Sequence, residues 1–396
     1  MRKIDLTNFR LATSGTVREI NRRIALSFIR RQAPLSRADL ARSSGLQPST
    51  VSAIIDELIE EGWVTEGIGH ALRGRRPRLL HLNVEHAGIL AVDLRPEMTT
   101  VGLAGVDARF LEQASWRTPD DPRAFIEAIT RTVRGFQKRH PQVTCEGMGV
   151  SLPGRVDRDG RLVFAPNLRW GTVNLRALLE AAIEMPVAVE NAASACALAE
   201  LWFGRHPESV RNLVAVTISE GIGVGLLMNG QLLRGGDSRA GEFGHVTLDE
   251  NGPRCPCGNR GCWERYASNS AAVQGYLDAV SGGSPRKGAA LTFEQLIELT
   301  RSGDRHAVAT IERMAEFLGL GLAGLITGLS PEVVVIVGEV TGIWDRVGPI
   351  VARVVKRRAL PGTTTRIVPT DPALQPRLRG AATLVVQEHF GAPNVA

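Results

Sequence analysis

Cysteine and long apolar runs are what this sequence has least of. Its 396 residues include five cysteines, and no apolar run reaches the length of about 18 residues that a membrane-spanning helix needs. The N-terminal stretch MRKIDLTNFRLATSG also lacks the apolar core of a signal peptide. These absences exclude a helical membrane protein and predict a cytoplasmic location, where clustered thiols more often bind a metal than form disulfides. The content of 43% apolar and 22% charged residues is ordinary for a globular chain of two or three domains.

Excess charge is also absent from most of the chain. The formal net charge is +6, and residues 1–82 carry all of it, with 14 Lys and Arg against 8 Asp and Glu. The other 314 residues hold 33 of each sign. This asymmetry indicates a small basic module that meets a polyanion, attached to a neutral domain. The alternative is a solvated basic surface without a partner.

Three helices are predicted in the basic segment. In the first, apolar residues recur at helical spacing: Val17, Ile20, Ile24 and Phe28. Pro34 ends that helix. The second helix begins after the N-cap candidate Ser36 and ends near Gly45, and the third runs from Pro48 to Gly62.

The second and third helices are typical of a helix-turn-helix, because a glycine-containing turn joins them and small polar residues open the third. The side chains predicted to meet DNA in the major groove are Gln47, Ser49, Thr50 and Ser52. Apolar segments at 63–65 and 79–82 flank a basic, glycine-rich tip, which predicts a β-hairpin wing. The arginines of that tip suit a minor groove: Arg73, Arg75 and Arg76. The alternative is a three-helix module that binds protein.

The neutral segment alternates strand and helix patterns, which indicates an α/β protein. Strands are predicted within residues 86–118, 145–157, 211–233 and 331–340, and a helix at 121–140. Several of these strands run into glycine-rich loops. Such loops are typical of a sheet that binds its ligand at the strand ends.

The cysteines are concentrated in one loop, PRCPCGNRGCWE at 253–264. It contains three of the five: Cys255, Cys257 and Cys262. Gly258 and Gly261 allow sharp turns, so three thiolates could face one zinc ion, which needs a fourth ligand to complete a tetrahedron. The alternative is a loop of reduced, unliganded thiols. Cys145 and Cys196 lie in apolar surroundings and are predicted core residues.

Four stretches of the neutral segment form a specific signature in combination. They are LPGRVD…APNLRW, VENAASACALAE, SEGIGVGLLMNGQLLRGGDSRAGEFGHV and CPCGNRGCWERYAS. On these motifs the chain resembles the ROK family, and the N-terminal winged helix makes it similar to the repressor branch, which includes xylose and N-acetylglucosamine repressors. The resemblance implies an actin-like fold of two α/β lobes with the ligand between them. It divides the chain into a winged helix-turn-helix domain at 1–82 and a sugar-binding domain at 83–396, with a zinc loop at 245–264.

The resemblance also implies roles for single residues. In the family, a histidine that corresponds to His245 closes a structural zinc site with the three cysteines, so no ligand position stays open. The residues implied in sugar binding are Gly154, Asn167, Asn191, Glu242, His245 and Glu264. The zinc loop would hold His245 and Glu264 in the cleft.

Four departures from the pattern of the family's kinases remove ATP chemistry. The aspartate that deprotonates the sugar hydroxyl is replaced by Ala192, whose methyl group accepts no proton. The phosphate turn Asp-x-Gly-Gly-Thr reads DLRPE at 93–97, without glycine and with a proline that lacks an N–H. Two further glycine loops read SEG at 219–221 and GE at 338–339.

The interpretation is therefore a sugar-responsive transcriptional regulator, a repressor without enzymatic activity. It would bind double-stranded operator DNA as a homodimer or homotetramer on a palindromic site. Sugar in the cleft would change the angle between the lobes and, through residues 81–88, the spacing of the recognition helices. Two alternatives stay open: a sugar kinase with a fused DNA-binding domain, and a DNA-binding regulator whose effector domain is vestigial.

Overall fold

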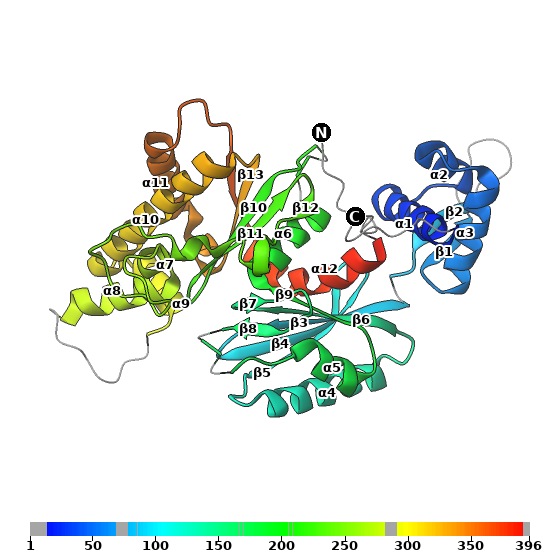
Figure 1. Ribbon diagram of the computed structural model, residues 1–396, viewed down its shortest axis with the longest axis horizontal. Helices are drawn as coiled ribbons and strands as arrows, with labels where there is room; N and C mark the ends of the chain where they lie inside the picture. The colour runs from blue at the N-terminus through cyan, green and yellow to red at the C-terminus, as the bar shows by residue number, and fades with distance from the viewer. Residues whose placement is uncertain are drawn as a thin grey trace.

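The computed structural model describes residues 14–390 except residues 69–77, 85, 166, 169, 205, 208 and 282–290. Figure 1 shows an N-terminal helical module beside two lobes, each built on a β-sheet. The predicted fold class, a winged helix-turn-helix followed by a two-lobed α/β domain, is confirmed. Among the described helices, none has the length and apolar character that crossing a bilayer requires.

The N-terminal module has three helices and a two-stranded antiparallel sheet. Its elements are α1 (Ser14–Gln32), α2 (Arg37–Ser44), α3 (Pro48–Glu60), β1 (Val64–Ile68) and β2 (Arg78–Leu82). Ser36 and Asp39 form a reciprocal capping box at the start of α2, and Gly45, with a φ of 74°, ends the helix. α3 is amphipathic and buries one face: Val51, Ile54, Ile55 and Leu58.

α1 forms over the predicted segment, but its most buried residues are not the ones that showed the helical spacing. Val17 is 50% exposed, and the other predicted apolar positions are only partly buried. The fully buried residues are instead Ala25, Leu26 and Ile29. α1 packs against α2 and α3, and also against α12 (Pro376–Phe390) at the far end of the chain. The periodicity predicted the helix correctly, but it carries no information about this remote partner.

The first lobe is built on a mixed sheet in the order β5-β4-β3-β6-β9. Its strands are β3 (Ala87–Leu94), β4 (Met98–Gly105), β5 (Phe110–Arg117), β6 (Thr144–Leu152) and β9 (Val187–Asn191). Helices α4 (Pro122–Arg139) and α5 (Leu175–Ile183) pack onto one face, where Phe125 and Leu179 share a core with Leu90 and Met148. A short hairpin, β7 (Arg155–Val156) and β8 (Leu162–Phe164), follows β6.

The second lobe is built on a sheet in the order β12-β11-β10-β13-β14. Its strands are β10 (Leu213–Ile218), β11 (Ile222–Met228), β12 (Gln231–Leu232), β13 (Val333–Val337) and β14 (Arg366–Pro369). The helices of this lobe are α7 (Glu264–Ala267), α8 (Asn269–Ser281), α9 (Phe293–Arg301), α10 (Arg305–Leu329) and α11 (Trp344–Arg358). The 3₁₀ turns are η1 (Gly236–Ser238), η2 (Glu242–His245), η3 (Glu339–Ile343) and η4 (Pro372–Leu374). α10 and α11 pack together on one face of the sheet.

Helices α6 (Ala192–Phe203) and α12 lie between the two sheets (Figure 1). α6 packs on β10 and β11 of the second lobe, whereas α12 packs on β3 and β6 of the first. The fit is close, because a Cβ at Gly149 of β6 would overlap the carbonyl oxygen of Ala381 in α12. One apolar cluster continues from Leu26 and Trp63 of the winged helix to Leu378 and Val385 of α12. α12 therefore contacts the winged helix, the sheet of the first lobe and helix α6, which packs on the sheet of the second lobe.

Candidate functional sites

The leading end of α3 is exposed, as a recognition helix requires. Gln47 and Ser49 are exposed, and Thr50 and Ser52 are partly exposed. Pro48 occupies the first turn, where its missing N–H costs no hydrogen bond. The four predicted residues thus lie on consecutive turns at one helix end. Their amide and hydroxyl groups can bond to base edges or phosphates.

Arg37 joins α2 to α3 and to the wing, a role that the sequence did not indicate. Its Nε donates to Oε1 of Glu66 in β1 at 2.9 Å. Its guanidinium also lies 2.8 Å from Oδ1 of Asp56 in α3. These contacts set the angle between the two helices and the wing strand. No spacing rule could have identified them, because the partners lie on other elements.

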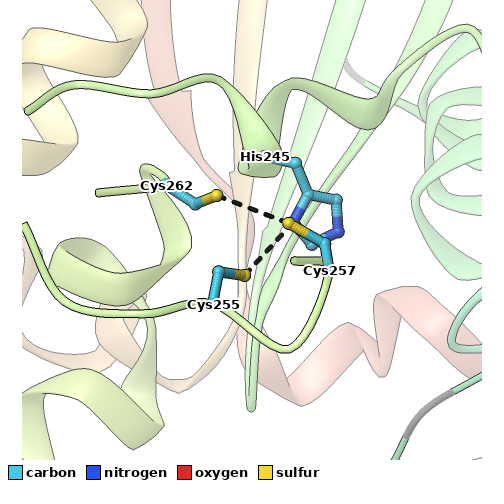
Figure 2. A group of neighbouring side chains, drawn as sticks. All are labelled: His245, Cys255, Cys257 and Cys262. Atoms are coloured by element: carbon cyan, nitrogen blue, oxygen red, sulfur yellow. Dashed lines mark hydrogen bonds between the residues drawn. The ribbon is translucent and has the colours of Figure 1, made fainter. Parts of the chain in front are cut away.

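The predicted metal ligands come together in one cluster (Figure 2). The one nitrogen and three sulfur donor atoms of His245, Cys255, Cys257 and Cys262 all lie within 4.8 Å of one another. His245 ends the 3₁₀ turn η2, and the cysteines lie on the loop before α7. Gly261, with a φ of 60°, has no room for a Cβ because the Asp249 carbonyl oxygen lies against it. The tight loop therefore depends on glycine at this position.

The donor distances fit a tetrahedral metal. Cys257 Sγ lies 3.6 Å from Cys262 Sγ, and Cys255 Sγ lies 3.6 Å from His245 Nδ1. A tetrahedral ion with bonds of about 2.3 Å holds its donors roughly 3.8 Å apart. The four side chains are thus already spaced as ligands of one ion. They could bind a metal with little movement.

The electrostatics of the loop also indicate a cation. Burial raises the pKa of the Cys255 and Cys262 thiols, and the Glu264 carboxylate raises both further. Cys255 donates to Oε1 of Glu264 at 3.2 Å. Thiols in such surroundings stay protonated unless a bound cation stabilises the thiolates. The donor set therefore suits a metal better than it suits a reactive cysteine.

Cys145 and Cys196 are core residues, as predicted, although Cys145 is only partly buried. Burial raises the pKa of Cys145 to about 11 and that of Cys196 to about 12. Neither thiol is a nucleophile at neutral pH.

Three of the predicted sugar-binding residues adjoin the metal cluster. His245 Nδ1 lies 3.5 Å from Oε1 of Glu264, and His245 Nε2 lies 3.8 Å from Oε2 of Glu242. Gly221 packs against the Glu264 carboxylate, so a Cβ at this position would displace that carboxylate. Glu242 is half exposed, whereas Glu264 is mostly buried. The loop thus supports two carboxylates and an imidazole that could accept and donate hydrogen bonds.

The other predicted sugar residues lie in the first lobe and are used differently. Oδ1 of Asn191 caps α6 by accepting from the Ala193 N–H at 2.8 Å, and its Nδ2 donates to the Gly154 carbonyl oxygen at 2.7 Å. Gly154, with a φ of 99°, also has no space for a Cβ. Asn167 is exposed. Asn191 and Gly154 therefore fix each other, and Asn191 keeps only one amide hydrogen for a ligand.

A hollow of about 1480 Å³ lies at the junction of α1, α6, α12 and both lobes. Its lining includes Arg30, Glu190 and Arg234. Among the described residues that line it, Glu242, His245 and Glu264 do not occur. It is thus a separate feature from the predicted sugar site. Because the winged helix forms part of its wall, movement of that module against the lobes would change its shape.

Two family profiles match the chain. The profile described as "ROK family" matches residues 89–388, and the one described as "Winged helix-turn-helix DNA-binding" matches residues 18–65. Together they account for both the lobes and the N-terminal module.

Similar proteins include a regulator with the same two parts. The xylose repressor of Bacillus spizizenii is 29% identical over 386 residues, which is 96% of this chain and 98% of that protein. A solved ROK family transcriptional regulator, described as a homolog of the E. coli MLC protein, has a TM-score of 0.81 at 25% identity, and the match covers 95% of this chain and 97% of that one.

A kinase matches the lobes alone. The ROK family glucokinase from Streptomyces griseus, solved with glucose and AMPPNP, has a TM-score of 0.66 at 27% identity. The match covers 98% of the glucokinase but 75% of this chain. The N-terminal module is thus shared with the regulators rather than with this enzyme.

Proposed function

This chain belongs to the ROK family, and on that basis we propose that it is a transcriptional repressor that responds to a sugar. One observation carries the proposal: a winged helix shares a continuous apolar core with a two-lobed domain of the kinase type. Such packing supports signalling between the two parts, because a change in one alters the surface on which the other rests.

The winged helix binds operator DNA in this proposal. The exposed Gln47 and Ser49 at the start of α3 read base edges in the major groove, and Thr50 and Ser52 contact edges or phosphates. Arg73, Arg75 and Arg76 lie outside the described residues, so their entry into a minor groove stays a prediction from the sequence. A homodimer or homotetramer presents two such helices to a palindromic site, as two-fold symmetry requires.

The metal is zinc, and its role is structural. Three sulfurs and one imidazole nitrogen form a closed tetrahedral set, which is typical of structural zinc. Zinc supplies the positive charge that lets the buried thiols ionise. The chain's own residues then hold the loop so that Glu242, His245 and Glu264 keep their positions.

The effector is a monosaccharide or a close derivative. Glu242 and Glu264 accept from sugar hydroxyls, and His245 Nε2 donates when Nδ1 binds the metal. Gly154, Asn167 and Asn191 supply contacts from the first lobe. The names of the similar proteins include a pentose, xylose, and a hexose, glucose, so both sizes are candidates.

Phosphoryl transfer is not part of this function. Ala192, the first residue of α6, is 3% exposed and stands where the family's kinases have the catalytic aspartate. No carboxylate replaces it at that position. The lobes therefore bind a sugar without activating its hydroxyl.

The test combines two measurements on the full-length, zinc-loaded protein. Selection from a random duplex library should enrich a palindrome whose half-sites are about one helical turn apart. Thermal unfolding against a panel of free and phosphorylated sugars should reveal one that stabilises the fold, by about 2.7 kcal/mol at a hundredfold excess over Kd.

Glu242→Gln is the informative variant, because its carboxylate is exposed and has few structural contacts. It should lose the sugar response and keep the enriched sequence. Glu250→Gln, a change of the same kind on an exposed residue nearby, is the matched control. A protein that enriches DNA but responds to no sugar would contradict the effector part of the proposal. One that enriches no sequence would contradict its DNA-binding part.

A further inference from the structure

A chain of ion pairs crosses from one lobe to the other. Arg95 follows β3 in the first lobe, and Glu339 opens η3 directly after β13 in the second. Nη1 of Arg95 lies 2.9 Å from Oε1 of Glu339, and its Nε lies 3.0 Å from Oδ2 of Asp93. One guanidinium therefore bridges a carboxylate of its own lobe and a carboxylate of the other.

Each of the two carboxylates also accepts a hydrogen bond from a second side chain. The second oxygen of Glu339 accepts from Nδ2 of Asn269, at the start of α8, at 2.9 Å. The second oxygen of Asp93 accepts from Nε of Arg377, near the start of α12, at 2.9 Å. Asp93 and Arg377 are each 6% exposed. The bridge between the lobes is thus one link in a mostly buried network.

The network is fully charged at neutral pH. Burial opposes ionisation of Asp93, but Arg377 and Arg95 outweigh it and lower the pKa of that carboxyl. In the same way Arg95 lowers the pKa of Glu339 against the effect of burial. Two cations and two anions balance, so the loss of one member leaves a partner charge uncompensated in a poorly solvated place.

Both ends of the bridge lie in stretches that depart from the sequence pattern of the family's kinases. Arg95 lies in the turn at 93–97, which lacks the glycines of their phosphate turn, and Glu339 follows Gly338 in one of the two other altered glycine loops. Gly338, with a φ of 137°, allows no Cβ because the Ile218 carbonyl oxygen lies against it. The two departures noted separately in the sequence are therefore partners in one contact.

Helix α12 continues the path to the winged helix. Arg377 lies at its first turn, and at its last turn Gln387 accepts from Nε1 of Trp202 at 2.6 Å. Arg30 of α1 lies over the Trp202 ring at 4.3 Å and donates to the Trp202 carbonyl oxygen at 2.9 Å. His389 packs against Trp63, just before β1, with ring centroids 4.7 Å apart and ring planes tilted by 41°.

We propose that the Arg95–Glu339 pair is an interlobe latch, and that α12 transmits its state to the winged helix. With the latch formed, Asp93 and Arg377 hold α12 in the position on which α1 and Trp63 rest. When the lobes separate, Arg95 loses Glu339, and the packing of α12 against the module changes. The latch itself does not depend on the proposed function; its effect on DNA affinity does.

Hydrogen–deuterium exchange of the full-length, zinc-loaded protein tests the latch without DNA or sugar. Glu339→Gln and Arg95→Gln, singly and together, remove the charges with little change of shape. Exchange should rise about five- to tenfold in residues 94–98 and 337–343, and also in residues 22–30 of α1. The double variant should resemble Arg95→Gln, because that single change already removes the pair with Glu339 together with the contact between Arg95 and Asp93.

Glu312→Gln is the matched control. It breaks an ion pair with Arg346 at 3.3 Å, but both residues lie in the second lobe. Its exchange should match the wild type in all three segments. A rise confined to the lobe segments would overturn transmission through α12, and unchanged exchange in every variant would overturn the latch.

Operator affinity is the second measurement. Glu339→Gln should change the Kd for the selected duplex severalfold, in whichever direction the released state favours, while Glu312→Gln leaves it unchanged. If the wild type binds no duplex, the proposed function fails while the exchange result still decides the latch. If the duplex binds equally to wild type and Glu339→Gln, transmission to the DNA-binding surface is contradicted.

Discussion

At the scale of single residues, the metal loop depends on four donors whose positions are already set. The thiols of Cys255 and Cys262 are buried beside Glu264, so they need a cation to ionise. The same loop holds His245 between Glu242 and Glu264. In the proposed function, metal binding and sugar binding are therefore linked through one histidine side chain.

Cys262→Ser should remove the metal and the sugar response together. A serine hydroxyl is a poor zinc ligand, so the ion content should fall from about one per chain to near zero, with a lower melting temperature. Metal analysis and thermal unfolding measure both effects. Cys145→Ser, a thiol in the first lobe, should keep full metal content. A Cys262→Ser protein with unchanged metal would contradict the ligand assignment.

The sequence predicted this cluster well because ligand spacing on one loop is a local property. Cys255, Cys257 and Cys262 could be identified from their spacing, and His245 from the resemblance. The use of Asn191 could not be predicted, because its amide could serve a ligand, a helix cap or the Gly154 carbonyl, and only the fold shows that it serves the last two. The residue type alone does not show which partners a polar side chain hydrogen-bonds to.

At the scale of elements, the N-terminal end of α3 is exposed, and the side chain of its N-cap residue Gln47 makes no capping hydrogen bond. Gln47→Ala with Ser49→Ala should weaken specific DNA binding by about 1–3 kcal/mol per lost base contact and leave the melting temperature unchanged. Fluorescence anisotropy with the selected duplex measures the affinity. Gln113→Ala, on exposed β5, is the control with the same chemical change. Equal affinity in wild type and the α3 variant would move the recognition surface elsewhere.

The contact between α12 and the winged helix should weaken in acid. Burial and the nearby Arg22 and Arg23 lower the pKa of His389, whose ring packs against Trp63. The joined state therefore binds fewer protons than the separated one, so stability falls as the pH drops below the ordinary histidine pKa of about 6.5.

His389→Phe keeps the ring and removes this titration. As the pH is lowered from about 7.5 to about 5.5, the melting temperature of the wild type should fall relative to that of His389→Phe. Any pH dependence of the metal site is the same in both proteins, so it cancels when the two melting temperatures are subtracted. His81→Gln, which removes a histidine from the exposed side of β2, is the control. Parallel pH curves for wild type and His389→Phe would refute this account of the junction.

Element boundaries were predictable wherever the chain carries its own stop and start signals. Ser36 and Gly45 bound α2 as expected, and Pro34 follows the end of α1. The buried face of α1 was not predictable, because Leu26 and Ile29 belong to a core that α12 completes. Local patterns give the type of an element but not all of its neighbours.

At the scale of the whole molecule, the two lobes have the architecture of the family's glucokinase. The residues expected at the catalytic and phosphate-binding positions of such a kinase are replaced in this sequence. Incubation of the zinc-loaded protein with ATP and the sugar panel should yield no more sugar phosphate than a control without protein. Ala192 carries no base, and Arg95, which pairs with Glu339, lies in the turn at 93–97 that lacks the glycines of the phosphate turn. Coupled-enzyme detection with the family's glucokinase as positive control measures this. Turnover above background would restore the kinase alternative.

Long-range partners mark the limit of what the sequence predicts. The loss of glycine at 93–97 and at 338–339 was visible, but Arg95 and Glu339 are 244 residues apart, and their pairing depends on the closure of two lobes. The same holds for Arg377 and Asp93. The sequence predicted the loss of nucleotide chemistry, and the structure shows an ion pair that joins two of the altered stretches.

The most direct test of the central claim is the coupling between sugar and operator. The Kd for the selected duplex is measured with and without the stabilising sugar, and the Kd for that sugar with and without the duplex. A sugar-responsive repressor requires the sugar to change the DNA affinity by about 5- to 150-fold, and the duplex to change the sugar affinity by the same factor and in the same direction. A sugar that binds the protein and leaves the DNA affinity unchanged would contradict the account.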